Sequence, residues 1–145
     1  MHGLYRKWVN PLFTPKEINK LDGKIRQYAQ DYCATIKAKG TCEFMSEFAF
    51  EFPIKVFLEL MGLPQEMTAE FLEWEMGLLH TNDLAEIAGS TRKVVDYLRS
   101  EIADRKANPR DDLISYGVTT QIDGRPLTDD ELIGFAFNLF IGGMD

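Results

Sequence analysis

Apolar and polar residues follow one another along this chain mostly with the spacing of helices. In long segments the apolar residues recur every three or four positions, which is the repeat of one helix face. The predicted helices span residues 15–39, 47–61, 68–79, 84–107 and 128–145, with shorter helices at 2–10 and 111–118 and a brief strand at 41–44. The pattern therefore predicts a mainly helical fold.

The boundaries of these segments carry sequence signals of their own. Thr14-Pro15-Lys16-Glu17 and Thr128-Asp129-Asp130-Glu131 have the form of capping boxes, in which side chains bind the free amides of a helix start. Pro53 should start a turn or kink the segment 47–61, because proline cannot donate a helical hydrogen bond. Asp123-Gly124 is typical of a tight turn between two strands and predicts one small β-hairpin.

The last helix is apolar on nearly every side, which is typical of a helix at the centre of a large protein. It ends on Gly142-Gly143-Met144-Asp145. Each glycine destabilises a helix by about 1 kcal/mol relative to alanine. The pair also leaves backbone bare, so that a bulky ligand can touch it. Asp145 at the edge of such a groove suggests proton transfer beside a flat, apolar cofactor.

Two sets of residues combine polar groups on one predicted helix face. The first set lies on the last helix and consists of Asn138, Ile141, Gly142 and Asp145. Such a stripe fits either a polar seam between helices or a functional site, because buried polar groups need partners. The second pair, His2 and Arg6, is four residues apart and would suit two carboxylates, although the spacing can also be incidental.

Composition excludes several classes of function. A net charge of −7 argues against nucleic acid as the main partner. No apolar segment reaches the roughly 20 residues that cross a bilayer, and the N-terminus lacks the apolar core of a signal peptide. Cys33 and Cys42 are too few for a disulfide scaffold and lack a metal-binding pattern. We expect them to be buried free thiols in a cytoplasmic protein.

The motifs, taken in order, resemble those of a bacterial cytochrome P-450, a haem-thiolate monooxygenase, and are most similar to the camphor-hydroxylase branch. The similar stretches are residues 2–7, 10–15, 42–44, 52–54, 60–64, 112–114, 127–131 and 142–145. The resemblance implies the multi-helix cytochrome P-450 fold, mainly α, with one small β-hairpin. It also implies that residues 1–145 are the central part of a single domain. That part would run from the basic helix at the haem propionates through the first half of the oxygen-activation helix, and would be incomplete at both ends.

The resemblance also implies roles for individual residues. His2 and Arg6 would bind the haem propionates, and Gly142 and Gly143 would face the distal side of the haem. Asp145 would pair with an alcohol to relay protons to bound dioxygen. The remaining assignments are a substrate pocket at Leu78, Leu79, Asn138 and Ile141, and a redox-partner surface at Arg6 and Lys7. The cysteine that ligates iron would lie beyond residue 145, so this chain would hold no metal ligand.

The implied parent enzyme hydroxylates a small apolar substrate, such as a terpenoid. It uses dioxygen, haem b (iron protoporphyrin IX) and electrons from an iron–sulfur ferredoxin, and residues 68–107 form a mobile lid over its substrate channel. The expected location is the cytoplasm, with neither nucleic acid nor membrane as a partner, and the 145 residues alone should be inactive. Two alternatives lack haem: a small helical protein-interaction domain and a helical domain that binds apolar ligands.

Overall fold

The computed structural model describes residues 10–144, apart from the side chains of Leu12, Glu17 and Met144. It is mainly helical, with one two-stranded antiparallel hairpin. After a 3-10 turn at Asn10–Phe13, the α-helices are α2 (Pro15–Lys39), α3 (Glu51–Met61), α4 (Thr68–Leu79), α5 (Leu84–Ala107), α6 (Leu113–Thr119) and α7 (Asp129–Met144). The strands are β1 (Gln121–Ile122) and β2 (Arg125–Pro126), and two shorter helical turns are η2 (Met45–Ala49) and η3 (Gln65–Met67).

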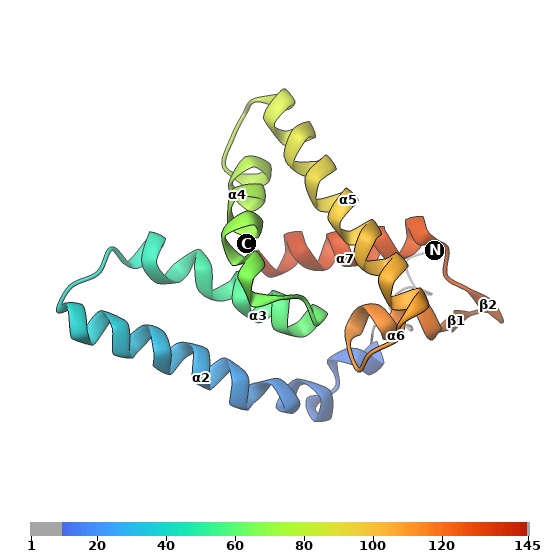
Figure 1. The fold of residues 1–145 in the computed structure, drawn as a ribbon, viewed down its shortest axis with the longest axis horizontal. Helices are drawn as coiled ribbons and strands as arrows, with labels where there is room; N and C mark the ends of the chain where they lie inside the picture. Colours follow the sequence, from blue (N-terminus) through green and yellow to red (C-terminus); the bar gives the residue numbers. More distant parts are fainter. Residues whose placement is uncertain (1–9, 145) are drawn as a thin grey trace.

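The helices surround a core at the junction of α3, α4, α5 and α7 (Figure 1). Helices α4 and α5 form an antiparallel pair, and α7 passes behind α5 toward α3 and α4 in this view. Helix α2 lies along α3 on the outside, and those of its side chains that the structure describes are half-buried or exposed. The core therefore fixes α3, α4, α5 and α7, while α2 is attached to it from one side.

Aromatic rings join the four core helices. The Phe71 ring on α4 lies 5.8 Å from Phe57 on α3 and 5.3 Å from Phe140 on α7, measured between ring centroids. Phe71 also contacts Trp74 and Tyr97 at 4.8 and 5.4 Å. Each such pair contributes about 0.5–1.5 kcal/mol beyond the burial of its area. This cluster sets the position of α7 against α3 and α4.

Hydrogen bonds from tyrosines attach α2 to α3. The Tyr28 hydroxyl donates to Glu59 over 2.6 Å, and the Tyr32 hydroxyl donates to Glu51 over 2.7 Å. Burial of the phenol, with the hydrogen bond to Glu59, raises the pKa of Tyr28 to about 12. Both tyrosines are on the half-buried side of α2, which therefore contacts a neighbouring helix.

Several predicted boundaries are confirmed. The helices at 15–39, 68–79 and 84–107 begin and end where the sequence signals placed them. At the start of α7, the Thr128 amide donates to Glu131 over 2.9 Å and the Glu131 amide donates to Thr128 Oγ1 over 3.3 Å, which is a reciprocal capping box. Asp123 and Gly124 have φ of 51° and 79°, as a type I′ turn requires.

The predicted strand at 41–44 is wrong. Residues 41–43 form an irregular connection, and Phe44 already has helical φ and ψ before η2, which is a π-helical turn. A strand needs a neighbour for its hydrogen bonds, and the only strands among the described residues pair with each other at 121–126. Pro53 stands in the first turn of α3, where its missing amide costs no helical hydrogen bond.

The expectation of two buried thiols is also wrong within the described residues. Cys33 is exposed and Cys42 is half-buried. The half-buried stripe of α2 follows Leu21, Ile25 and Tyr28. Cys33 lies off this stripe and therefore faces away from α3.

One charged residue of α5 is buried within the described structure. The Arg105 side chain is completely buried, and its guanidinium donates to Asp112 over 2.7 Å, to Glu101 over 2.7 Å and to the carbonyl of Gly62 over 2.8 Å. Burial opposes the charged form, but the hydrogen bond and charge of Asp112 outweigh it, and the pKa of Arg105 is raised. This one side chain links the end of α3, helix α5 and the start of α6.

Replacing Arg105 should strongly destabilise the fold. In Arg105→Leu the Asp112 carboxylate, whose side chain is 6% exposed, loses its buried partner, and we expect the free energy of unfolding to fall by about 3–5 kcal/mol. The matched control Arg99→Ala removes an exposed pair with Asp96 on the same helix and should cost less than about 1 kcal/mol. Urea unfolding of both variants measures the difference. Similar losses in the two variants would contradict a special role for Arg105.

Candidate functional site

Helix α7 has one covered face and one open face. Leu132, Ile133, Ala136 and Phe140 are buried against α3 and α5, which places them in the core. On the open side, Asn138, Gly142 and Gly143 are exposed. A Cβ atom built on Gly134, Gly142 or Gly143 would meet no other atom within 4 Å. The result is an open side of α7 with bare backbone at Gly134 and, near the end of the helix, at Gly142 and Gly143.

Helix α7 is more apolar than is usual for a helix with one exposed side. The residues between its two faces are also apolar and only half-buried, and they include Phe135, Phe137, Leu139 and Ile141. The prediction of a helix surrounded on all sides is therefore met on one side only, within the described part of the chain. An apolar helix with a bare, uncovered stripe has the surface expected of a contact with a large apolar group.

Asn138, Ile141 and Gly142 lie on one side of α7, whereas Asp145 lies outside the described residues. Asn138 is exposed, and no described residue hydrogen bonds its amide. Its side chain therefore offers donors and an acceptor beside apolar and bare positions of the same stripe. The alternative of a polar seam between two helices finds no partner helix on this side among the described residues.

The other predicted site residues fall in two groups. Leu78 and Leu79 lie on the last turn of α4; Leu78 packs at the edge of the core, whereas Leu79 is 39% exposed. Helix α4 reaches α7 through the Phe71–Phe140 contact, and the pocket that would join the leucines to Asn138 and Ile141 stays a prediction. His2, Arg6 and Lys7 lie outside the described residues, as does Asp145.

Sequence reasoning missed a buried carboxylate on α4. Glu75 is 3% exposed, and its Oε1 lies 3.0 Å from His80 Nε2, while Oε2 is buried with no hydrogen-bond partner among the described residues. The His80 ring in turn contacts the Phe50 ring, with centroids 5.7 Å apart. One signal was present in the sequence: Glu75 follows Phe71 by four positions and so falls on the core face of its helix.

A polar hollow of about 320 Å³ separates α2 from the start of α3. Its lining includes Tyr32, Glu51 and Lys55. These groups are engaged with one another, since Tyr32 donates to Glu51 and the Lys55 ammonium lies 5.3 Å from the Tyr32 ring. Burial of the phenol, with the hydrogen bond to Glu51, raises the pKa of Tyr32. The hollow is therefore part of the contact between the two helices.

Residues 10–144 contain neither a cluster of metal-binding side chains nor a membrane-spanning helix. No group of three or more His, Cys, Asp or Glu side chains in this range is placed to hold a metal ion. No helix in this range combines the length and apolar character needed to cross a bilayer. The open stripe of α7 is thus the feature of the described structure that best fits a ligand site.

Comparison with known proteins shows which proteins this chain resembles. No profile of a known protein family matches the chain. The chain is 32% identical to a probable cytochrome P450 127A1 of Sinorhizobium fredii, across 99% of this chain and 35% of that protein. It is 34% identical to an erythromycin C-12 hydroxylase of Saccharopolyspora erythraea, across 98% of this chain and 37% of that protein.

A solved structure shows the same fold. The polyketide-synthase cytochrome P450 PksS of Bacillus subtilis aligns with 99% of this chain and 38% of its own length, at 32% identity and a TM-score of 0.91. Sequence and fold together identify the chain as a segment of a cytochrome P450. It spans little more than a third of the length of the curated relatives it matches. The resemblance of its motifs to bacterial members of this family is thereby confirmed.

Glycine substitutions test whether the stripe is open. Gly134→Ala should raise the free energy of unfolding of the 145-residue chain by up to about 1 kcal/mol, because helix propensity improves and the new methyl group meets nothing. Gly77→Ala should lower it, because its Cβ would lie 2.2 Å from Ser90 Oγ on α5. Urea unfolding compares the two variants. A loss of stability in Gly134→Ala would show that other residues cover this face.

Proposed function

We propose that the full-length protein containing this chain is a haem-dependent monooxygenase that hydroxylates a small apolar substrate. The observation that carries the proposal is the bare backbone of Gly142 and Gly143 on the exposed side of an apolar helix. Close relatives in sequence are named as cytochrome P450s or hydroxylases. Residues 1–145 would form the central part of a single domain, and we expect the protein in the cytoplasm.

The open stripe fits haem b, iron protoporphyrin IX. A planar macrocycle needs an apolar wall from which no side chain projects. Gly142 and Gly143 have no Cβ atom, and a Cβ built at either position would meet no other atom within 4 Å. Ile141 adds apolar surface beside them, and Gly134 is a further position without a side chain, more than two turns earlier on the helix. The described residues therefore suit contact with one face of the group, while its iron ligand would come from elsewhere in the protein.

The haem would supply the oxidising chemistry with dioxygen, and the chain would supply orientation, protons and exclusion of water. His2 and Arg6 would bind the two haem carboxylates through charge-assisted hydrogen bonds. Asp145 would deliver protons at the edge of the groove through its carboxyl group. Arg6 and Lys7 would form a positive surface for an acidic iron–sulfur ferredoxin that donates electrons.

The pocket residues suggest what kind of substrate enters. Leu78, Leu79 and Ile141 would form apolar walls, whereas the Asn138 amide has no described partner and would hydrogen bond an oxygen atom of the substrate. A terpenoid with one oxygen function has this chemistry. One relative has a name that refers to an apolar substrate of this kind: it is a steroid C26-monooxygenase of Mycolicibacterium smegmatis, at 30% identity.

Absorption spectroscopy of the full-length protein tests the proposal directly. After reduction under carbon monoxide, we expect the red-shifted haem band that thiolate ligation produces. The matched variant Gly142→Leu should retain the fold but incorporate less haem, because its side chain would occupy the bare groove. A purified protein that contains no tetrapyrrole, yet binds apolar ligands, would contradict the proposal.

A substitution of Asp145 tests its proposed role in proton delivery. Asp145→Asn in the full-length enzyme should lower the turnover number by about a hundredfold, since general acid catalysis contributes roughly 10²–10⁴, and should change the substrate Kd little. Asp130→Asn, at the exposed start of the same helix, should change neither quantity. Turnover and substrate titration are measured on both variants. Equal losses of turnover and binding in Asp145→Asn would argue against proton delivery.

A further inference from the structure

A small apolar cavity lies in the core where α3, α5, α6 and α7 meet. All four helices contribute apolar side chains or a glycine to its lining, which consists of Met61, Ile102, Leu113, Ile114, Gly117, Leu132, Phe135 and Ala136. Seven of these residues are buried, and Phe135 is half-buried. The cavity is therefore an internal space of the core on the covered side of α7.

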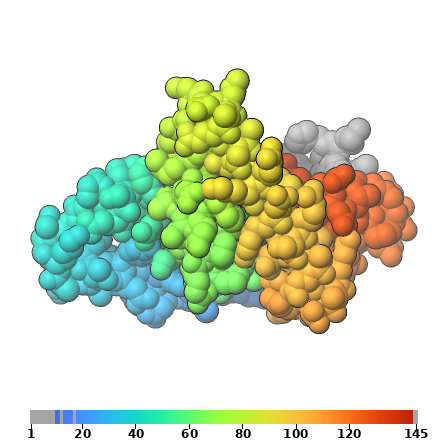
Figure 2. All heavy atoms as spheres, turned by 45° about the horizontal axis from the view of Figure 1, so that its top comes forward, coloured from blue at the N-terminus to red at the C-terminus, as the bar shows by residue number. Residues whose placement is uncertain are grey.

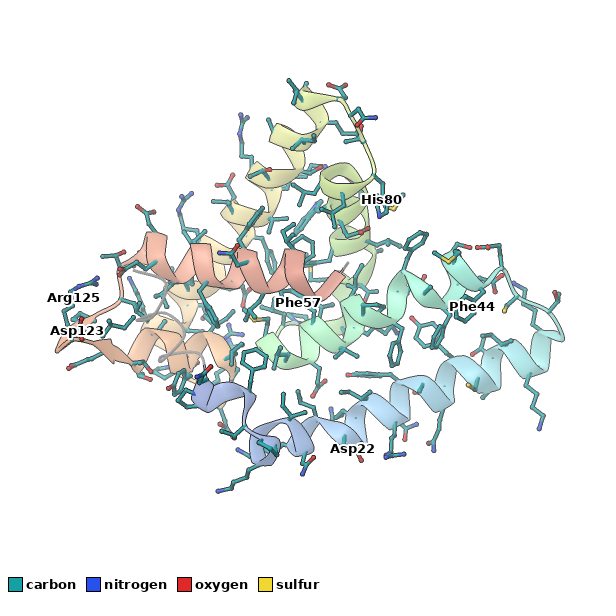
Figure 3. The ribbon with its side chains drawn as sticks, turned by 180° about the vertical axis from the view of Figure 1, so that it is seen from behind. Asp22, Phe44, Phe57, His80, Asp123 and Arg125 are labelled. Carbon is teal, nitrogen blue, oxygen red and sulfur yellow. The ribbon has the colours of Figure 1, made fainter. Side chains whose placement is uncertain are left out.

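The helices around this cavity are packed closely together. In Figure 3, α6 and α7 lie beside each other next to the hairpin that carries Asp123, and α5 passes behind α7. Figure 2 shows the atoms of α5 and α6, in yellow and orange, as a closed surface on the face in view. A molecule inside the cavity is therefore screened from solvent on this face.

The buried guanidinium of Arg105 holds three walls of the cavity in place. It donates to the carbonyl of Gly62 over 2.8 Å and to Asp112 over 2.7 Å. Each of these two residues is next in sequence to a lining residue, one at the end of α3 and the other at the start of α6. Ile102 lines the cavity three residues before Arg105 on α5. Because one side chain fixes all three segments, they cannot readily move together and close the space.

The size and chemistry of the cavity decide what it can hold. The centre of a water-sized sphere can occupy about 10 Å³ of it, which is about the room that one small molecule requires. A buried water molecule needs about two to four polar partners, and this lining offers almost no polar surface. An apolar molecule loses no hydrogen bond on entering and gains dispersion contacts with the walls. The cavity therefore suits a small apolar molecule and not water.

We propose that this cavity is a binding site for one molecule of a small apolar gas, and that dioxygen occupies it in the full-length protein. The choice of dioxygen rests on the proposed function above, in which dioxygen is a substrate, whereas the affinity for apolar gases rests on the cavity alone. Ala136 precedes Gly142 by six residues, which is about 9 Å along the axis of α7. The site thus holds the gas close to the open end of the same helix.

Crystals of the full-length protein, cooled under krypton pressure, test the site. Krypton is apolar and monatomic, and its X-ray scattering locates it. We expect one krypton atom among the lining residues, and the same position to be occupied in crystals cooled under dioxygen pressure. An empty cavity, an ordered water in it, or krypton bound only elsewhere in the protein would overturn the gas site.

Two variants change the volume of the cavity in opposite directions. Ala136→Val adds two methyl groups to the wall and should abolish the krypton peak, whereas Ile114→Val removes one methyl group and should raise its occupancy. The matched control Ala103→Val adds the same atoms on the exposed side of α5 and should leave the occupancy unchanged. Ile114→Val is the smaller perturbation, so it keeps the test decisive if Ala136→Val does not fold. Equal occupancy in Ile114→Val and Ala103→Val would contradict binding inside the cavity.

The outcomes separate the gas site from the proposed function. Krypton in the cavity without dioxygen at the same position would overturn dioxygen as the occupant. Krypton in the cavity of a protein that contains no haem would support the gas site and refute the proposed function. Krypton and dioxygen in the cavity of a haem-containing protein would support both.

Discussion

The buried guanidinium of Arg105 is the interaction on which the arrangement of the described helices depends. It contacts the carbonyl that ends α3, the carboxylate of Glu101 on its own helix, and Asp112 before α6. Asp112 in turn caps α6 by accepting from the Ser115 amide over 2.7 Å. Gly62 permits this approach: its φ is 68°, and a Cβ there would lie 2.4 Å from that of Asp112. Three chain segments thus converge on one charge.

This anchored framework explains how α7 can be both fixed and open. Phe140 and its neighbours bind one side of α7 to the aromatic core, so the position of the helix does not depend on its other side. The opposite side can then carry glycine and an unpaired amide, which would otherwise weaken a packed helix. The core therefore holds α7 in place from one side, and the candidate site lies on the other side of the same helix.

Periodicity and local chemistry were enough to predict most of the fold. Capping residues such as Thr128, and turn residues such as Asp123, act within a few positions, and their outcomes matched the prediction. The errors came from long-range contacts. Arg105 looks like any charged helix residue until Gly62, 43 positions away, supplies its acceptor. Glu75 is similar, because the burial of this residue depends on the elements packed against α4.

The candidate site shows the same division. The bare stripe of α7 could be predicted, because glycine spacing along one helix is local information. The partners of that stripe come from other segments, so sequence spacing could only suggest them through family resemblance. His2, Arg6 and Asp145 remain predictions of that kind. The close approach of α4 and α5 at Gly77 and Ser90 has one mechanical consequence: it leaves no room between the two backbones at this crossing, so the pair is braced there against compression.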